Sequence, residues 1–471
     1  MSRKYLIETF GCQMNYHDSE QMAGLLESAG YDPAADESEA DVVVVNTCSV
    51  REHAEEKLYT RLGELRALRS SSGRDPVVVV AGCVAQQEGD RLLERSDHVV
   101  DVVVGSRRVR MLPVLVEHAT HERAAQVDLG AHDEVAFPFS VTRRKDPVRA
   151  WVTIIEGCNE FCSFCVVPYT RGHERMRPKA EILAEVRAAA AGGHREVQLL
   201  GQIVNHYQAP DDPACDFAGL LEAVQQVDGI DRIRFASPHP RHVSKRLIAA
   251  LRDLPKVCRH LHLPVQSGSN RVLRAMRRRY TREGFLDLVC EIRETVPGIG
   301  LSTDLIVGFP GETAGDFDET LSLMEAVRFQ SVFSFKYSPR PNTLALKRMP
   351  DDVAEEEKTR RIVALQGLQR SIQLALHAGM VGGVEAVLVD SVSRRRATEL
   401  SGRTSGNIVV NLPGTTEWMG ALLPVRIERA GPNSLWGRVH DFSLTGEVAK
   451  PTLSVNHLRA GAADGDPCKS R

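Results

Sequence analysis

The chain has 471 residues, enough for two or three domains, and its 42% hydrophobic and 26% charged residues are the balance of a soluble globular protein. The net charge of −3 argues against a uniformly basic coat, so any RNA partner must be held by local patches. No apolar run approaches the ~20 residues that span a membrane, and the start MSRKYLIETFGC has the features of neither a signal peptide nor a transit peptide. We therefore expect a cytoplasmic protein without a membrane partner, whose ten cysteines indicate metal or redox chemistry rather than disulfides.

The first part of the chain contains three apolar runs that are typical of buried parallel strands, at residues 4–12, 41–48 and 76–83. Residues 18–30 and 51–69 lie between these runs and carry apolar residues at helical spacing. This alternation of strands and helices predicts a small βαβ, Rossmann-like domain of the α/β class.

Each of the three runs ends in a cysteine, namely Cys12, Cys48 and Cys83. The carboxyl ends of parallel strands meet at one edge, and open α/β sheets bind ligands at that edge. A single cysteine after a strand is usually a core residue. Three equivalent placements, two of them directly after glycine, favour a ligand set instead. Three converging thiolates could hold an iron–sulfur cluster with one iron left free.

A second group of cysteines follows the strand-like run 151–155 as a C-x₃-C-x₂-C loop, with Cys158, Cys162 and Cys165. Thiolates at this spacing can bind three irons of a 4Fe–4S cube and leave the fourth iron without a protein ligand. An open iron can chelate S-adenosylmethionine and reduce its sulfonium, which releases a 5′-deoxyadenosyl radical that breaks unactivated C–H bonds. The alternative is a structural zinc site, which needs a fourth ligand, and His173 is the nearest candidate.

The middle of the chain alternates strand-like and helix-like segments. The predicted strands are 151–156, 195–200, 231–236, 260–265, 301–307 and 331–337. Amphipathic runs between them include 179–191, 217–227 and 244–254. Six βα units predict a partly open parallel barrel rather than a closed eight-fold one.

Polar clusters follow four of these strands, at residues 201–205, 237–240, 266–269 and 308–312. Barrel chemistry gathers at the carboxyl ends of strands, so these clusters are candidate binding positions. Asp304 lies inside a strand, where a carboxylate needs a partner. Pairing with a barrel arginine is the favoured interpretation of Asp304, and ligand binding is the alternative.

Residues 353–377 predict a helical linker, after which short alternating strands at 384–389, 407–411 and 422–427 predict a small OB-like β-barrel of the kind that binds RNA. Two arginine-rich stretches, 171–177 and 271–282, suit phosphate oxygens. A solvated helix face explains the second stretch equally well.

The chain contains the motifs ETFGCQMN, VNTCSVRE and AGCVAQ, which are followed by the C-x₃-C-x₂-C loop. In these motifs it resembles the methylthiotransferases of the radical S-adenosylmethionine superfamily. CSVREHAEEK and CVVPYTRGHERMRP resemble the bacterial tRNA branch of that family, and LSGR at 400–403 with VVN at 409–411 resembles its RNA-binding TRAM domain. The resemblance runs from about Tyr5 to His440. At Ile203 relatives usually have asparagine, which puts a local contact in question but not the reaction class.

The resemblance implies an N-terminal methylthiotransferase domain at 3–119, a radical S-adenosylmethionine core at 144–374, a TRAM domain at 377–441 and a disordered tail at 442–471. It implies two 4Fe–4S clusters: an auxiliary one on the first three cysteines and a radical-generating one on the C-x₃-C-x₂-C loop. The S-adenosylmethionine contacts that it implies are Gly201, Gln202, Ser237, Gln266, Ile306 and Gly308.

The implied reaction converts N6-isopentenyl(dimethylallyl)adenosine at position 37, beside the tRNA anticodon, to its 2-methylthio derivative. One S-adenosylmethionine methylates a sulfur at the auxiliary site, and a second yields the radical that removes hydrogen from C2 of the adenine. The implied partners are this tRNA, a flavodoxin- or ferredoxin-like electron donor and a donor of sulfur or iron–sulfur units. The alternatives are the same reaction on threonylcarbamoyladenosine or on a ribosomal protein and, more remotely, a non-catalytic iron–sulfur RNA-binding sensor.

Overall fold

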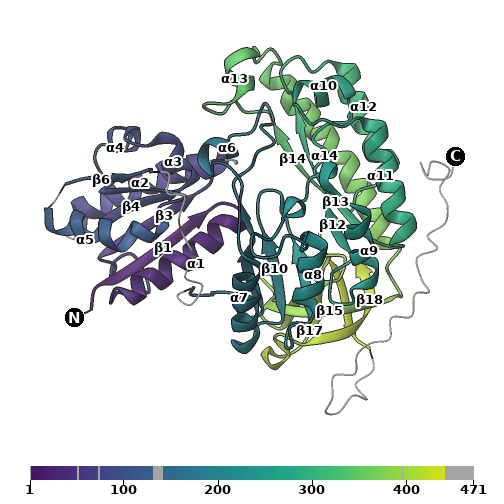
Figure 1. Cartoon of the computed structure of the whole chain (residues 1–471), viewed down its shortest axis with the longest axis horizontal. Coiled ribbons are helices and arrows are strands. Elements are labelled where there is room, and N and C mark those ends of the chain that lie inside the picture. Colours follow the sequence, from purple (N-terminus) through teal and green to yellow (C-terminus); the bar gives the residue numbers. More distant parts are fainter. Residues whose placement is uncertain are drawn as a thin grey trace.

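The computed structural model describes residues 2–49, 52–72, 75–122, 124–130, 142–394 and 396–440. It contains three β systems in chain order, each with its own core (Figure 1). The tail expected at 442–471 lies outside the described residues. No helix in the described ranges is long and apolar enough to cross a membrane.

The N-terminal unit is a parallel six-stranded sheet in the order β2-β1-β3-β4-β5-β6. Its strands are β1 (Lys4–Phe10), β2 (Asp32–Pro33), β3 (Val42–Thr47), β4 (Val77–Gly82), β5 (Val102–Gly105) and β6 (Gln126–Asp128). Helices α1 (Gln13–Ser28) and α5 (Leu112–Glu122) cover one face, and α2 (Glu52–Ser72), α3 (Cys83–Glu88) and α4 (Arg91–Arg95) cover the other. Alternate valines of β3 and β4 enter the two cores because successive strand residues point to opposite faces. The predicted βαβ domain is confirmed.

The central unit has six parallel strands in two sheets, β7-β10-β11 and β12-β13-β14, joined by a parallel bridge between Ile233 and Val257. The strands are β7 (Arg149–Thr153), β10 (Glu196–Leu200), β11 (Arg232–Phe235), β12 (His260–His262), β13 (Gly300–Val307) and β14 (Ser331–Lys336). One continuous core joins them to the outer helices, so the predicted partial (βα)₆ barrel is confirmed. β12 ends before the predicted boundary because Pro264 has no N–H to donate.

The helices of the central unit follow its strands. They are α7 (Lys179–Ala191), α8 (Phe217–Gln225), α9 (Lys245–Asp253), α10 (Asn270–Ala275), α11 (Arg282–Thr295), α12 (Ala314–Val327), α13 (Leu344–Arg348) and α14 (Glu355–Ala378). Between β7 and α7 lie a two-residue ladder, β8 (Ile155–Glu156) with β9 (Arg175–Met176), and the short α6 (Val167–Thr170). Single 3₁₀ turns are η1 (Val109–Met111), η3 (Val204–His206), η4 (Pro240–His242) and η5 (Thr416–Trp418).

The C-terminal unit is a closed five-stranded barrel in the order β15-β16-β17-β19-β18. Its strands are β15 (Val384–Val392), β16 (Glu399–Thr404), β17 (Val409–Pro413), β18 (Leu422–Ala430) and β19 (Leu435–Val439). The barrel lies against the amino ends of β7, β10 and β11, at the lower edge of Figure 1. The predicted OB-like barrel is confirmed.

Buried arginines join this barrel to the central unit. Arg232 donates to the main-chain oxygens of residues 386 and 403, and Arg234 donates to those of residues 404 and 405, the latter at 3.0 Å. Glu196 accepts from both Arg234 and Arg149 at 2.9 Å. Arg149 also reaches Asp390 of the barrel at 2.9 Å. The interface is therefore a buried ionic network that reaches the barrel through bonds to backbone carbonyls and through one ion pair with the Asp390 side chain.

Acid is expected to weaken this interface through Glu196. Burial opposes ionisation, but the charges of Arg234 and Arg149 outweigh it and lower the carboxyl pKa from 4.5 to about 2. The stabilisation is complete above pH 4.5 and is lost as the pH falls toward 2. Glu196→Gln should cost about 3–5 kcal/mol at neutral pH, because it leaves buried guanidinium groups uncompensated, and should flatten this acid loss.

Urea unfolding of both proteins between pH 5 and pH 2 measures the effect. The control is Glu325→Gln, a change at an exposed carboxylate on α12. Equal acid dependence in the wild type and in Glu196→Gln would contradict the assignment.

Candidate active site

Three neighbouring strands of the N-terminal sheet bring Cys12, Cys48 and Cys83 to one edge. β1, β3 and β4 are adjacent, and a cysteine directly follows β3 and β4 or caps the helix after β1. The Cys48 N–H donates to the Phe10 carbonyl at 3.0 Å, which ties two of these strand ends together. The structure thus places these three thiols as a group at the carboxyl edge of the sheet. We call them the sheet-edge cysteines.

Two glycines make this edge possible. A Cβ at Gly11 would lie 2.4 Å from Asn15 Oδ1, and a Cβ at Gly82, whose φ is +91°, would lie 2.3 Å from Asn46 Oδ1. The two asparagines are buried and hydrogen-bonded to each other at 3.2 Å. The hydrogen-bonded asparagines fix the strand ends and leave no room for a Cβ at the residues before Cys12 and Cys83. Glycine is therefore required at both positions.

A cation from the central unit lies beside the sheet-edge cysteines. A hydrogen bond from Cys48, helped by the charge of Arg171, lowers the pKa of Cys12 to about 6 against the effect of burial. Burial raises the pKa of Cys83, and Arg171 opposes that rise. Arg171 itself is buried and donates to Asp18 of α1 at 3.3 Å. An ion pair across the domain boundary therefore adjoins the cysteines.

The second group, Cys158, Cys162 and Cys165, lies on an irregular loop between β8 and α6, and we call it the cluster loop. The Cys158 N–H donates to the Gly172 carbonyl at 3.0 Å, and the Cys165 N–H donates to the Cys162 carbonyl at 3.0 Å. Burial raises the pKa of Cys158 to about 12, and burial with the charge of Cys162 raises that of Cys165. These thiols are close enough to influence one another electrostatically, and a bound metal cation would favour their thiolate forms.

Arg278 is a contact of the cluster loop that we had not singled out from the sequence. It is 5% exposed, donates to the Cys162 sulfur at 3.4 Å and to the Pro264 carbonyl at 2.8 Å, and binds Tyr280. From the sequence, the whole run 271–282 is predicted to bind phosphate or to form a solvated helix face. No pattern in that run distinguishes the one arginine that points inward.

Both groups fit an iron–sulfur cluster that is held by three cysteines, because each supplies three free thiols in one place. Within the described part of the chain, no three His, Cys, Asp or Glu side chains are grouped tightly enough for one metal ion. A cubane differs from such a site because each thiolate binds a different iron. His173, the candidate zinc ligand, pairs through Nδ1 with Asn159 Oδ1 at 2.9 Å.

The candidate S-adenosylmethionine contacts lie at the carboxyl ends of the barrel strands. Gly201 follows β10, where a Cβ would lie 2.3 Å from Ile155 Cγ2, and Gln202 beside it has a buried Oε1 without a partner in the described structure. Ser237 and Gln266 have φ of +60° and +76°, a region that non-glycine residues rarely adopt. Such backbone strain gathers at functional sites.

Ile306 and Gly308 lie at the end of β13. Gly308 has φ of +69°, its N–H donates to Glu312 at 2.9 Å, and a Cβ there would lie 2.3 Å from Lys358. Asp304 on the same strand pairs with His262 of β12 at 3.4 Å. The partner of Asp304 is therefore a histidine and not the arginine that we predicted.

His239 is a further polar group at these strand ends. Its Nδ1 accepts from the Arg241 N–H at 3.2 Å, so Nε2 carries the proton, and Nε2 is buried without a hydrogen-bond partner in the described structure. Burial and nearby arginines, Arg278 first, lower its pKa to about 2, so the imidazole is neutral. Asn205 fixes its backbone with two hydrogen bonds. Together with Gln202 Oε1, this leaves one donor and one acceptor available for a polar ligand.

The arrangement of the central unit has counterparts among solved structures and family models. A family model described as the radical SAM superfamily matches residues 152–324, "uncharacterized protein family UPF0004" matches 4–105, and the TRAM domain matches 379–440. The structure of the radical S-adenosylmethionine methyltransferase TsrM from Kitasatospora setae has a TM-score of 0.54 at 17% identity and covers 74% of this chain and 77% of that one. The fold is therefore that of a radical S-adenosylmethionine protein with an added N-terminal sheet and C-terminal barrel.

Curated relatives give the particular family. A protein of Geobacter metallireducens named tRNA-2-methylthio-N(6)-dimethylallyladenosine synthase is 47% identical over 437 residues, which are 93% of this chain and 98% of that protein. Proteins with the same name from Carboxydothermus hydrogenoformans and Chromobacterium violaceum are each 45% identical over 90% and 95% of this chain, and over 96% and 100% of their own length. The chain belongs to the tRNA-2-methylthio-N(6)-dimethylallyladenosine synthase family, which confirms the methylthiotransferase prediction.

Proposed function

We propose that this protein converts N6-isopentenyladenosine at position 37 of tRNA to its 2-methylthio derivative. The observation that carries the proposal is the match to relatives of that name along 93% of the chain, at 47% identity. The chemistry is consistent with the architecture, because an adenine C2–H has no useful acidity and calls for a radical. We also retain the division into 3–119, 144–374 and 377–441, and a cytoplasmic setting, as proposals.

The cluster loop and the sheet-edge cysteines take separate roles in this proposal. Cys158, Cys162 and Cys165 hold the 4Fe–4S cluster that, when bound, reduces S-adenosylmethionine to the 5′-deoxyadenosyl radical. Arg278 orients the loop through its hydrogen bond to the Cys162 sulfur. Cys12, Cys48 and Cys83 would hold the auxiliary cluster, which would supply the sulfur that is transferred.

Polar groups at the strand ends position S-adenosylmethionine in this proposal. Gln202 Oε1 accepts from the ligand, and the neutral His239 donates to it through Nε2–H, because each is a buried polar atom to which the described residues offer no partner. Gly201 and Gly308 leave room for close approach, and Ser237, Gln266 and Ile306 complete the set. Expulsion of water by the buried walls protects a radical from side reactions.

The tRNA binds in part through the C-terminal barrel. Trp436 lies between Arg429 and Arg438, whose guanidinium carbons are 4.2 and 5.5 Å from its ring centroid. An aromatic ring with flanking cations suits stacked bases and phosphates of RNA. The target adenine must leave its stack to reach the buried site, which is easiest in a loop. A donor of electrons and a donor of sulfur complete the set of proposed partners.

Mass spectrometry of tRNA nucleosides tests the proposed reaction. Cells that lack this protein should accumulate isopentenyladenosine without its methylthio form, and the wild-type gene should restore the modified nucleoside. A change only in threonylcarbamoyladenosine, or only in a ribosomal protein, would assign the chain to those substrates instead. No change in either, with normal RNA binding, would favour a non-catalytic sensor.

A further inference from the structure

Two short helices form the outer cover of the cluster loop. Ser163, between Cys162 and Cys165, donates through its N–H to the Met276 carbonyl at 3.1 Å and through Oγ to the Ala275 carbonyl at 2.8 Å. Its own carbonyl accepts from the Ala345 N–H at 2.8 Å. α10 and α13 thus bind the loop through hydrogen bonds to Ser163, and a small apolar core, against which Phe164 of the loop also packs, joins them at one end of the molecule (Figure 1).

The outer side of this cover is basic and its charges are uncompensated. Arg274, Arg277, Lys347 and Arg348 are exposed, and the described structure gives none of them an ion pair or a side-chain hydrogen bond. The segments 270–279 and 344–350 contain no acidic residue. We call these four residues the cation patch. Such a patch on a chain of net charge −3 attracts an acidic partner.

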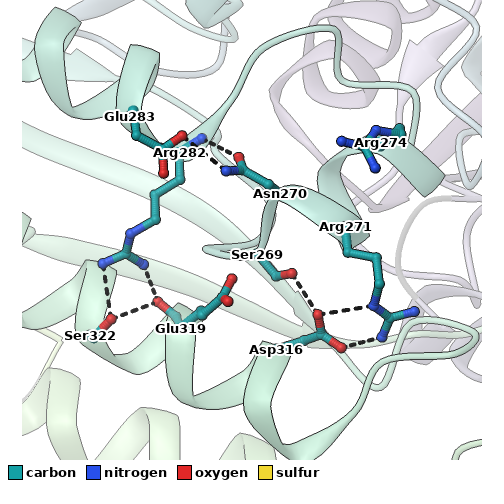
Figure 2. A pocket seen from close by; sticks show the side chains of 9 residues that line it. All are labelled: Ser269, Asn270, Arg271, Arg274, Arg282, Glu283, Asp316, Glu319 and Ser322. Carbon is teal, nitrogen blue, oxygen red and sulfur yellow. Dashed lines mark hydrogen bonds and ion pairs between the residues drawn. The ribbon is translucent and has the colours of Figure 1, made fainter.

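Neighbouring arginines are engaged and do not belong to the patch. A pocket of about 700 Å³ lies beside α10, and within it Arg271 pairs with Asp316 while Arg282 donates to Ser322 at 2.9 Å (Figure 2). Arg274 stands apart from these pairs at the rim (Figure 2). Its charge is therefore available to a partner, whereas Arg271 pairs with the carboxylate of Asp316 and Arg282 uses its guanidinium donors on Ser322 and on main-chain carbonyls.

Arg277 is held in a conformation that costs free energy. Its φ is +59° at the end of α10, where glycine is favoured, and this left-handed turn sends the next residue, Arg278, inward to Cys162. A non-glycine residue in this region costs of the order of 1 kcal/mol. Glycine would fit this backbone conformation better than arginine, so folding alone does not explain the arginine. An exposed charge next to Arg278, which contacts Cys162, could bind a docking partner.

Apolar side chains lie within the same surface. Leu346 is 48% exposed and Tyr169 is 45% exposed, and the Lys347 ammonium lies 5.9 Å from the Tyr169 ring centroid. Exposed apolar groups with a cationic rim are typical of protein docking sites. RNA needs phosphate contacts but gains little from an exposed leucine. The mixture therefore favours a protein partner.

We propose that the cation patch docks a small acidic electron-carrier protein that reduces the iron–sulfur centre held by Cys158, Cys162 and Cys165. The inference rests on the proposed function, which requires electrons at that centre. One electron leaves the reduced carrier and enters the centre, and no atom or proton is transferred. The route is short, because only the backbone of residues 275–278, the side chain of Arg278 and Ser163 separate the patch from the ligand loop. Electron transfer slows steeply with distance, so a carrier is best placed at this cover.

Neutralisation of the patch tests the proposal. In the full-length, cluster-loaded protein, the variant R274Q/R277G/K347Q/R348Q removes four charges, and glycine at 277 relieves strain rather than adding it. The control R187Q/K245Q/R328G/R370Q removes four other exposed charges, including an arginine at φ of +50°. Purified flavodoxin is the probe. Its affinity is measured by calorimetry at several salt concentrations, and S-adenosylmethionine cleavage is measured with reduced flavodoxin and, separately, with dithionite.

The patch variant should bind flavodoxin at least about tenfold more weakly and lose most of the salt dependence of binding. It should still cleave S-adenosylmethionine normally with dithionite. The control variant should behave as wild type. Unchanged flavodoxin affinity in the patch variant would overturn the proposal. If the variant also lost affinity for tRNA while flavodoxin binding stayed intact, the patch would be assigned to RNA. A dithionite-driven rate that falls with the flavodoxin-driven rate would also overturn it. Absence of cleavage in the wild type with dithionite would refute the proposed function, and the binding comparison would still decide the docking site.

Discussion

A variant with alanine at Cys158, Cys162 and Cys165 is expected to form no 5′-deoxyadenosine, because the proposed function assigns the reduction of S-adenosylmethionine to a cluster on these three cysteines. A variant with alanine at Cys12, Cys48 and Cys83 is expected to cleave S-adenosylmethionine and yet form no methylthio product, because the proposed function assigns sulfur delivery to these three cysteines. Both products can be measured by mass spectrometry in one assay, with an anticodon stem-loop that carries isopentenyladenosine. The iron content of each variant should fall from about eight to about four per chain.

Cys215→Ala is the matched control, since Cys215 is a buried free thiol in the central core, away from both groups. It should keep full iron content and both activities. Methylthio product from the protein without Cys12, Cys48 and Cys83 would refute the division of roles, whatever its iron content.

Arg171→Ala is expected to lower the free energy of unfolding by about 3–5 kcal/mol, because it leaves a buried carboxylate on Asp18 without its partner. Both side chains are nearly inaccessible, at 3% and 4% exposure. The same segment is tied to the N-terminal unit by Ser106, which donates to the Thr170 carbonyl at 2.6 Å, and by Arg107, which donates to the Arg171 carbonyl at 2.7 Å. The ion pair therefore lies within the contact between the N-terminal unit and the segment that follows the cluster loop.

Urea unfolding of the single variants Arg171→Ala and Asp18→Ala and of the double variant measures the coupling between the two side chains. The double variant should be less destabilised than the sum of the single ones. Arg246→Ala, which removes an exposed cation that pairs with Asp216 and Glu222, should cost less than about 1 kcal/mol. Additive costs at Arg171 and Asp18 would show that the pair does not act as a unit.

Most of the fold follows from the spacing of apolar residues along the sequence and from the residues that bound each apolar run. Runs of valine that are bounded by glycine or asparagine predict strands buried on both faces, and these runs became β3 and β4. α1 begins at Gln13, five residues before the expected start, because Cys12 and Asn15 form a capping box with residue types that the usual pattern does not include. β6, a three-residue edge strand, is too short and polar to give a periodic signal.

Part of the candidate site could be predicted from the sequence, because its cysteines follow predicted strands at recognisable positions. The residues that support those cysteines come from elsewhere in the chain. Arg171 meets Asp18 across 153 residues, and Arg278 meets Cys162 across 116. Neither pairing has a sequence signal, since any arginine in a basic run could turn inward. His239 was visible as part of a polar cluster, but only its burial and the bond to Nδ1 show which nitrogen carries a proton.

The contact between the barrel and the central unit constrains some features of the barrel and leaves others free. Arg232 and Arg234 bind main-chain oxygens of residues 386 and 403–405, so they recognise the path of the backbone and are indifferent to the side chains there. Substitutions on the outer surface of the barrel leave these bonds intact. Gly402 is different, because a Cβ would lie 2.4 Å from the Leu388 carbonyl. The outer side chains of this barrel can therefore change during evolution while its attachment to the central unit stays the same.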